Sequence, residues 1–320
     1  MNRTSPTCAV VDIGTNSVRL LVATLDAEGA LQPIERHIRV TRLGQGVDDT
    51  KCLHPDAIAR TVAVLADYRA IWDGFSVPEQ MVVLMATSAV RDAVNADVFT
   101  QAAVDACGIA PQVISGSLEG EIAFLGATAD QPPIPILVID IGGGSTEFVL
   151  GDASGEIIAS TSEQLGCVRL TERTGQPPYA DGTITRARAG ARAVINEAAS
   201  VLPTPIDPAT RLIGVAGTVS TLAALDLDLD QYEADRIHGT AVSKAAVAHW
   251  VSVLAAMDAT RIEALGPVEG NRGDVMPIGA IILDEIMDVF GFDEVIASEH
   301  DSLDGMCFKL LTGNRPAAIR

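Results

Sequence analysis

"VIDIGGGSTEFVLGDASGEI", residues 138–157, repeats a pattern that the chain uses earlier in "VVDIGTNSVRLLVATLDAEGAL", residues 10–31. Each copy has an apolar strand that ends in Asp-Ile-Gly, a loop of small polar residues, a second strand and a turn that contains Gly. The distance between the copies is far longer than the repeat of a solenoid protein. The pattern therefore predicts two copies of one domain.

The elements around the two copies follow the same order. The first half predicts strands over 8–13, 18–25 and 31–41, a helix over 55–72, a strand over 81–88, a helix over 95–107, a strand over 111–115 and a helix over 117–128. The proline-rich segment 129–136 ends this half. The second half predicts strands over 136–141, 145–151, 156–161 and 211–216, helices over 184–201, 243–255, 259–263 and 274–290, a strand over 294–297 and a helix over 302–312. The sequence predicts an α/β protein with domains 1–128 and 129–320.

The composition limits the possible partners and location. A length of 320 residues with 48% apolar residues supports two aliphatic cores. The net charge of −20 argues against binding to nucleic acid or to an anionic membrane. The longest apolar runs are shorter than the roughly 18 residues of a membrane helix, so we expect a soluble, untargeted protein. The five widely spaced cysteines lack a CxxC pair, which favours a reducing cytoplasm and buried, unreactive thiols.

The repeated loops have the composition of phosphate-binding turns. Small side chains allow backbone N–H groups to surround an anion closely. The alignment pairs Gly14 with Gly142 and Ser17 with Ser145, and it places Arg19 where the second copy has Glu147. An arginine can hold phosphate, whereas a carboxylate can hold a divalent metal or water. A single such loop is better explained by an ordinary glycine hairpin turn, but the matched pair reverses that preference and predicts a phosphate clamp.

A third Gly-rich segment, "GVAGTVSTLAAL" at 214–225, follows an apolar strand and begins a helix. A helix N-terminus binds anions, so Gly217 and Thr218 are predicted to contact phosphate. A tight turn between strand and helix is the alternative. The sequence contains no GxxxxGK[ST], which argues against a P-loop NTPase.

Several motifs in this order resemble the exopolyphosphatase/guanosine pentaphosphate phosphatase (Ppx/GppA) family, in its short two-domain form from actinobacteria. They are "VDIGTNSVRL", "ATSAVRDAVN", "ISGSLEGEIAFLGA", "VIDIGGGSTEF", "LGCVRL" and "GVAGT". The resemblance implies two ribonuclease-H-like domains of the actin-like ATPase and sugar kinase superfold, with the active site in the interdomain cleft. It also implies hydrolysis of a terminal phosphoanhydride by water, assisted by Mg2+ or Mn2+.

The resemblance places the catalytic base at Glu119, although Leu118, Gly120 and Glu121 depart from the family's SGxEEAR pattern. Glu121 is a rival, but two helical positions rotate it roughly 200° away from Glu119. Glu147 is implied to position water or metal as a second catalytic residue. Asp140, Glu147 and Asp12 are the implied metal ligands.

The resemblance also implies the substrate contacts. They are Gly14, Thr15, Asn16, Ser17 and Arg19 in the first loop, Gly143, Gly144, Ser145 and Thr146 in the second, and Arg91. Arg91 could instead pair with Asp92 or Asp97 on the surface. Arg272 could reach phosphate or pair with Glu269. For His300, in a stretch that lacks the family's arginine, local hydrogen bonding is favoured over catalysis.

These observations predict an exopolyphosphatase that releases orthophosphate from inorganic polyphosphate. We expect a preference for short chains, because no further helical domain follows residue 320. The alternatives are a guanosine pentaphosphate (pppGpp) 5'-phosphohydrolase and, more remotely, a non-catalytic polyphosphate or nucleotide sensor. A sugar or acetate kinase is disfavoured, since the sequence has no recognisable adenosine-binding signature. The resemblance further implies a cytoplasmic homodimer.

Overall fold

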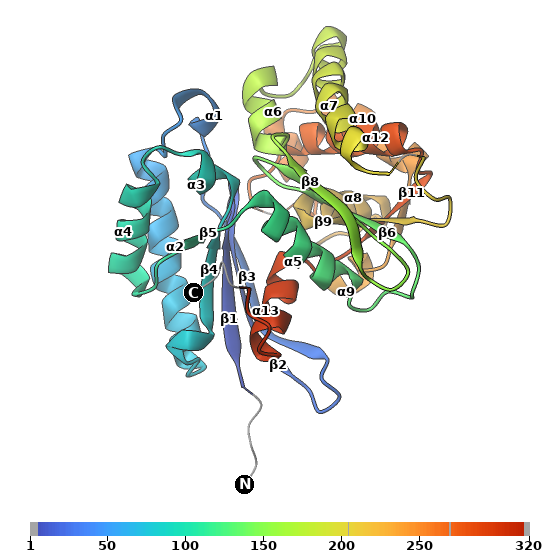
Figure 1. Cartoon of the computed structure of the whole chain (residues 1–320). Coiled ribbons are helices and arrows are strands. Elements are labelled where there is room, and N and C mark those ends of the chain that lie inside the picture. The colour runs from blue at the N-terminus through green and yellow to red at the C-terminus, as the bar shows by residue number, and fades with distance from the viewer. Residues whose placement is uncertain (1–5, 204, 269, 317–320) are drawn as a thin grey trace. The chain divides into compact units, whose positions relative to one another are not determined.

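The computed structural model describes residues 6–203, 205–268 and 270–316 and divides into two compact units (Figure 1). Unit 1 comprises Met1–Gly126 and Ser302–Arg320, and unit 2 comprises Ala127–Asp301. The boundary near residue 127 lies beside the predicted one at 128–129. The C-terminal segment differs from the prediction, because it packs in unit 1 rather than with residues 129–301.

Unit 1 is built on a five-stranded sheet. Its strands are β1 (Cys8–Ile13), β2 (Ser17–Leu25), β3 (Leu31–Val40), β4 (Val82–Ala86) and β5 (Gln112–Val113), in the order β3-β2-β1-β4-β5. Strands β1, β2 and β3 form an antiparallel meander, whereas β4 is parallel to β1 and β5 is parallel to β4. Connected strands and parallel crossovers therefore share one sheet, as the α/β prediction requires.

Alternate residues of β1 pack into two different hydrophobic clusters. Ala9, Val11 and Ile13 join the cluster under α2 (Pro55–Gly74) and α4 (Ala96–Cys107), which lie beside each other in Figure 1. Cys8 and Val10 join the cluster under α5 (Gly116–Thr128) and α13 (Ser302–Leu311). Because successive strand residues point to opposite faces, α13 completes the second face of this sheet.

Unit 2 has a six-stranded sheet. Its strands are β6 (Ile136–Ile141), β7 (Thr146–Gly151), β8 (Ile157–Glu163), β9 (Arg211–Val215), β10 (Ala241–Ser243) and β11 (Glu294–Ala297), in the order β10-β11-β9-β6-β7-β8. The core includes residues of α7 (Asp181–Val201), α8 (Ala216–Asp226), α10 (Lys244–Ala255) and α12 (Met276–Phe290). The nearly all-apolar α12 is buried along most of its length, as a central helix should be.

The two sheets repeat one topology. Strands β6, β7, β8, β9 and β11 occupy the positions of β1, β2, β3, β4 and β5, and β10 is an additional antiparallel edge strand. The loop hydrogen bonds also match, since Gly14 N donates to Ser17 O at 3.0 Å and Gly142 N donates to Ser145 O at 3.0 Å. The predicted fold class, two ribonuclease-H-like domains of the actin-like type, is confirmed.

Short elements account for the differences from the predicted secondary structure. The strand predicted over 81–88 ends at Ala86, and α3 (Ser88–Asp92) follows it; β5 has only two residues. Helix α11 (Ala259–Glu263) has the predicted bounds. The structure also contains six short elements that the sequence did not predict: α1 (Val47–Thr50), a 3-10 turn (Glu79–Met81), α3, α6 (Cys167–Thr174), α9 (Ala234–Ile237) and β10. Helices this short are marginal in isolation, so tertiary contacts rather than local propensity decide them.

The cysteines are free and mostly buried, as their spacing in the sequence predicted. All five cysteines are free thiols, and only Cys52 is partly exposed. Burial raises the pKa of Cys167 to about 11 and also raises the pKa of Cys107, so both thiols stay protonated near neutral pH. Within the described ranges, no helix is both long and apolar enough to span a bilayer.

Replacing Gly305 with Ala should destabilise the protein. A Cβ built on Gly305 in α13 would lie 2.0 Å from the carbonyl oxygen of Ile122 in α5, so the helix must move. We expect a loss of roughly 1–3 kcal/mol in the free energy of unfolding, measured by urea denaturation. Gly74→Ala is the matched control, because a Cβ there meets nothing within 4 Å and should stabilise α2 by roughly 0.5–1 kcal/mol. Equal stabilities of the two variants would contradict this packing.

Candidate functional site

The second loop, residues 142–145, has its carbonyl groups fixed by the N-terminus of α6. Cys167 N donates to Gly142 O at 3.0 Å, and Val168 N donates to Gly143 O at 2.9 Å. Arg169 holds the next carbonyl, because its Nε donates to Gly144 O at 2.7 Å. Three successive carbonyls are thus turned toward α6.

This arrangement fixes the amide groups of the same peptides. In a planar trans peptide the C=O of one residue and the N–H of the next point in opposite directions. The N–H groups of Gly143, Gly144 and Ser145 are therefore turned away from α6 together. Successive N–H groups directed to one side form a concavity that binds anions. The loop has the geometry that its composition predicted.

Gly166 allows α6 to approach this loop. A Cβ built on Gly166 would lie 2.3 Å from the carbonyl oxygen of Gly143 and 2.5 Å from Gly144 N. Any side chain at this position would collide with the loop backbone. The glycine before α6 is therefore required by the loop rather than by the helix.

The first loop is supported in the corresponding way by residues 41–44. Gly44 N donates to Thr15 O at 2.9 Å, and Arg42 N donates to Asn16 O at 2.8 Å. A Cβ on Gly44 would lie 2.3 Å from Cγ2 of Thr15. The N–H groups of Asn16 and Ser17 are accordingly turned away from residues 41–44. In each unit the segment that supports the loop contains a Leu-Gly pair, Leu43-Gly44 in unit 1 and Leu165-Gly166 in unit 2.

The residues at the base of each loop lie directly opposite each other across two antiparallel strands. Asp12 is the register partner of Arg19, and Asp140 is the register partner of Glu147. Arg19 donates from Nε and Nη2 to Oδ2 of Asp12, with the Nε contact at 3.1 Å. In unit 2, Oε1 of Glu147 accepts a hydrogen bond from Ser162 Oγ at 2.7 Å. The first pair is an ion pair, whereas the second pair consists of two carboxylates.

The carboxylate pair fits a hard divalent cation. Asp140 is 6% exposed and Glu147 is 2% exposed, so their charges have little screening by water. Carboxylate oxygens are the ligands that Mg2+ and Mn2+ prefer. Asp12 fits less well, because the guanidinium of Arg19 already neutralises it. The donor set on β6 and β7 is suited to Mg2+ or Mn2+.

Glu119 and Glu121 differ in their partners. Glu119 lies in the first turn of α5, where Ser115 Oγ accepts a hydrogen bond from Leu118 N and begins the helix. Oε2 of Glu119 lies 3.3 Å from Nη1 of Arg91, which also donates to Ile114 O. Nζ of Lys309 instead donates to Oε1 of Glu121. The helix thus separates the two carboxylates as the predicted rotation requires, and Arg91 pairs with Glu119 rather than with Asp92 or Asp97 in the contacts described.

Arg272 lies against the N-terminus of α8. A Cβ built on Gly217 would lie 1.5 Å from Nη1 of Arg272, so the guanidinium sits over the first turn of the helix. Thr218 packs on Gly279 of α12. A guanidinium and a helix N-terminus are both positive, so an anion between or beside them is favoured. Glu269, the other predicted partner of Arg272, lies outside the described residues.

Two further predicted residues have partners within unit 2. Thr146 is fully buried, and its hydroxyl donates to Leu165 O at 2.5 Å, so it fastens β7 to the segment before α6. The backbone N–H of His300 donates to Ser298 Oγ, and its imidazole lies near Asp130. The hydroxyl of Thr146 thus has a structural partner in Leu165, while the phosphate contact predicted for Thr146 stays a prediction.

The supports of the loops were missed at the sequence level. They are Gly44, Gly166 and Arg169, none of which was assigned a role. A signal was present, because Leu43-Gly44 and Leu165-Gly166 both follow the third strand of a meander. Extending the repeat alignment past the second strand would have found both glycines.

Comparison with known proteins agrees with this geometry. The model of the Ppx/GppA phosphatase family matches residues 21–313. The chain is 40% identical over 319 residues to "Exopolyphosphatase 2" of Mycobacterium tuberculosis, covering 94% of this chain and 98% of that protein. Among solved structures, an exopolyphosphatase-like protein matches with a TM-score of 0.87 and 32% identity, covering 96% of this chain and 98% of that one.

A Ppx/GppA protein of Aquifex aeolicus matches with a TM-score of 0.79 and 28% identity, covering 97% of this chain and 99% of that one. Each match extends over both units. The loops at residues 14–17 and 142–145, the acidic first turn of α5 and the matched folds therefore lead to one conclusion: the chain belongs to the Ppx/GppA phosphatase family.

Proposed function

We propose that this protein is an exopolyphosphatase, which hydrolyses the terminal phosphoanhydride of inorganic polyphosphate and releases orthophosphate. The observation that carries the proposal is the second loop, where three fixed amides lie beside the buried carboxylates of Asp140 and Glu147. The likeness to a protein named exopolyphosphatase supports the choice of substrate. The net charge of −20 repels a polyanion at long range, so the protein needs local groups that bind phosphate. The backbone amides of the loop can bind phosphate oxygens without a charged side chain.

Glu119 is proposed as the general base. Its carboxylate takes a proton from the attacking water while the water oxygen bonds to the terminal phosphorus and the bridging P–O bond breaks. Arg91 holds Oε2 of Glu119 and is itself fixed by Ile114 O, so the base has a defined orientation. The carboxylate of Glu119 accepts the proton in this proposal.

The amides and guanidinium groups are proposed to bind the phosphates. The N–H groups of Gly143, Gly144 and Ser145 and those of Asn16 and Ser17 offer fixed donors to phosphate oxygens. Arg272 adds a charge at the N-terminus of α8. Phosphoryl transfer depends mainly on positioning and charge neutralisation, which these groups provide.

Asp140 and Glu147 are proposed to hold Mg2+ or Mn2+. When bound there, the ion neutralises charge on the phosphate oxygens. Ser162 orients Glu147 through its hydrogen bond to Oε1. The two carboxylates therefore have their positions fixed by strand register and by one hydroxyl before any ion arrives.

A substrate panel tests the function directly. Polyphosphates of defined length and pppGpp are incubated with the protein and Mg2+ or Mn2+, and orthophosphate release is measured. We expect a higher kcat/KM for polyphosphate than for pppGpp, with short chains preferred. Preference for pppGpp would establish the alternative phosphohydrolase, and binding without turnover of either substrate would indicate a sensor.

Glu119→Gln should lower kcat by about 100- to 10,000-fold, because the amide cannot accept the proton. Polyphosphate binding, measured by calorimetry, should persist. Glu121→Gln is the matched control and should keep near-normal kcat, since Glu121 pairs with Lys309 in the same unit. If Glu121→Gln removes turnover and Glu119→Gln does not, the assignment of the base is wrong.

Glu147→Gln should weaken Mn2+ binding, measured by electron paramagnetic resonance, by about 10-fold or more. The cause is the loss of one charged oxygen opposite Asp140. Glu156→Gln, in the exposed turn between β7 and β8, is the control with the same chemical change. Unchanged Mn2+ affinity in Glu147→Gln would place the metal elsewhere.

A further inference from the structure

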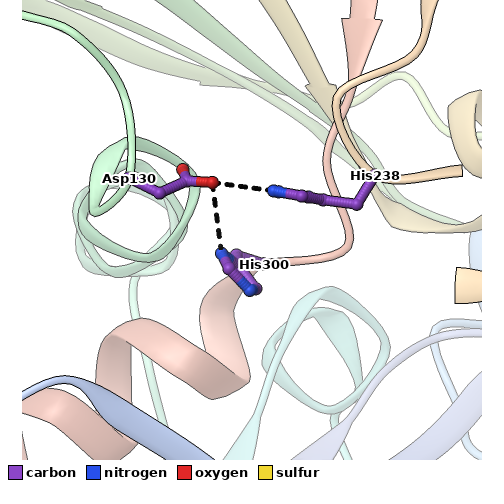
Figure 2. A group of neighbouring side chains, drawn as sticks. All are labelled: Asp130, His238 and His300. Carbon is purple, nitrogen blue, oxygen red and sulfur yellow. Dashed lines mark hydrogen bonds and ion pairs between the residues drawn. The ribbon is translucent and has the colours of Figure 1, made fainter. Parts of the chain in front are cut away.

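A second group of metal-binding side chains lies in unit 2 outside the phosphate loops. Figure 2 shows Asp130, His238 and His300 pointing toward one another. They come from three segments, the end of α5, the turn after α9 and the turn after β11. One ligand atom from each residue lies within 4.8 Å of those from the other two. This trio is called the His2Asp cluster below.

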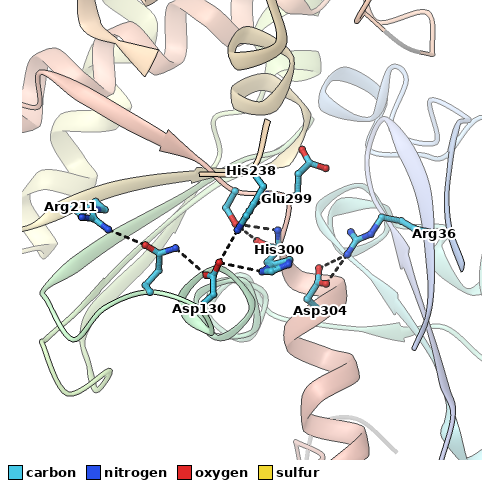
Figure 3. Close-up of polar contacts among 9 residues, drawn as sticks. Arg36, Asp130, Arg211, His238, Glu299, His300 and Asp304 are labelled. Atoms are coloured by element: carbon cyan, nitrogen blue, oxygen red, sulfur yellow. Dashed lines mark hydrogen bonds and ion pairs between the residues drawn. The ribbon is translucent and has the colours of Figure 1, made fainter. Parts of the chain in front are cut away.

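The carboxylate of Asp130 is held so that one oxygen faces both imidazoles. Oδ2 lies 2.7 Å from Nε2 of His238 and 4.0 Å from Nδ1 of His300. Oδ1 accepts a hydrogen bond from Nε2 of Gln131 at 3.0 Å, and Oε1 of Gln131 accepts one from Nη1 of Arg211 at 3.2 Å. Figure 3 shows this chain of contacts from Arg211 to the cluster. Support of a ligand by outer hydrogen bonds is a feature of metal sites.

The hydrogen bonds of His238 determine its protonation. An ionised carboxylate only accepts, so Nε2 of His238 must donate to Asp130. The backbone N–H of Glu299 only donates, so Nδ1 of His238 must accept at 3.2 Å. His238 is therefore neutral with its proton on Nε2. The two carboxylate oxygens of Asp130 face Nε2 of Gln131 and Nε2 of His238.

The backbone holds the two histidines side by side. Gly239 N donates to Ala297 O at 2.8 Å, and Ala297 N donates to Thr240 O at 2.9 Å. The ring centroids of His238 and His300 lie 4.5 Å apart. Two segments distant in sequence are thus locked together next to the imidazoles, which means that the ligands are assembled before an ion binds.

We propose that the His2Asp cluster is a binding site for Zn2+. Two imidazoles and one carboxylate match the donors that Zn2+ prefers, and they supply three of its four usual ligands. The side chains of Asp130, His238 and His300 are 40%, 25% and 42% exposed, so an ion reaches them from solvent. The fourth position is left to water.

Binding changes the tautomer of His238. To bind Zn2+ through Nε2, His238 would lose its Nε2 proton to solvent and take up one proton at Nδ1, so the hydrogen bond from Glu299 N–H would be lost. The proton lost and the proton gained by this ring would balance. His300 binds through Nδ1, the nitrogen that already faces Asp130. Metal binding would therefore replace the hydrogen bonds of His238 with Asp130 and with Glu299 N–H by one bond to the metal.

The position of the cluster gives the metal a structural role. Asp130 follows Ala127, the first residue of unit 2, by three positions, and His300 precedes Asp301, its last residue. Both covalent connections between the units therefore begin next to the His2Asp cluster. A bound ion would join the unit 2 ends of these two connections through one point.

Zinc titration of the full-length, metal-stripped protein tests the proposal. We expect one equivalent of Zn2+ to compete with a chromophoric chelator, in wild type and in Glu147→Gln alike. His238→Ala and His300→Ala should each weaken binding by about 10-fold or more, and Gln131→Ala by about 10-fold. His249→Ala, an exposed histidine elsewhere in unit 2, is the control and should change nothing.

A second measurement needs no variant. Anomalous diffraction at the zinc edge from wild-type crystals should give a peak between Asp130, His238 and His300. The proposal is overturned if Glu147→Gln removes the zinc equivalent, if both histidine variants bind normally, or if the peak lies elsewhere. Equal affinity of this cluster for Mg2+ would also overturn it, since Mg2+ prefers oxygen ligands.

Discussion

The contact between α6 and the second loop is the constraint on which the proposed chemistry depends. Three peptide carbonyls are bound on one side of the loop, by three backbone amides and the side chain of Arg169. Because the peptides are planar, this binding also decides where the amides point. The contact is possible only because residue 166 is glycine, since a side chain there would collide with the loop backbone. The proposed anion site thus depends on hydrogen bonds to the carbonyl groups on the opposite side of the same loop.

The two units share one strand register but place different charges in it. Strand register places residues 12 and 19 opposite each other in unit 1 and residues 140 and 147 opposite each other in unit 2. An arginine in one copy gives an ion pair with the aspartate, whereas a glutamate in the other places two buried carboxylates opposite each other. A single difference between the duplicated sequences therefore separates the ion pair from the proposed cation site without a change of strand register.

Much of the fold was predictable because long strands and helices have strong periodicity, and the duplication supplied the topology. The repeated Asp-Ile-Gly loops and Glu119 could also be found from the sequence. Arg169 could not, because its role is a hydrogen bond to a loop distant in sequence, made by a helix too short to predict. Thr146 shows the opposite difficulty, since its position in a phosphate-loop motif does not reveal that its hydroxyl points into the core. The transfer of α13 to unit 1 was hidden because its apolar face fits either domain equally well by composition.

The placement of α13 has a consequence for biosynthesis. Residues 127–301 form unit 2 as one uninterrupted segment, whereas the core of unit 1 includes Leu303, Met306 and Cys307 beside Cys8 and Val10. The ribosome therefore delivers every residue of unit 2 before the last helix of unit 1 exists. Until then, α5 covers only its own part of that face of the N-terminal sheet, and the part that α13 covers stays exposed. Unit 1 can therefore complete its core only after all of unit 2 has been synthesised.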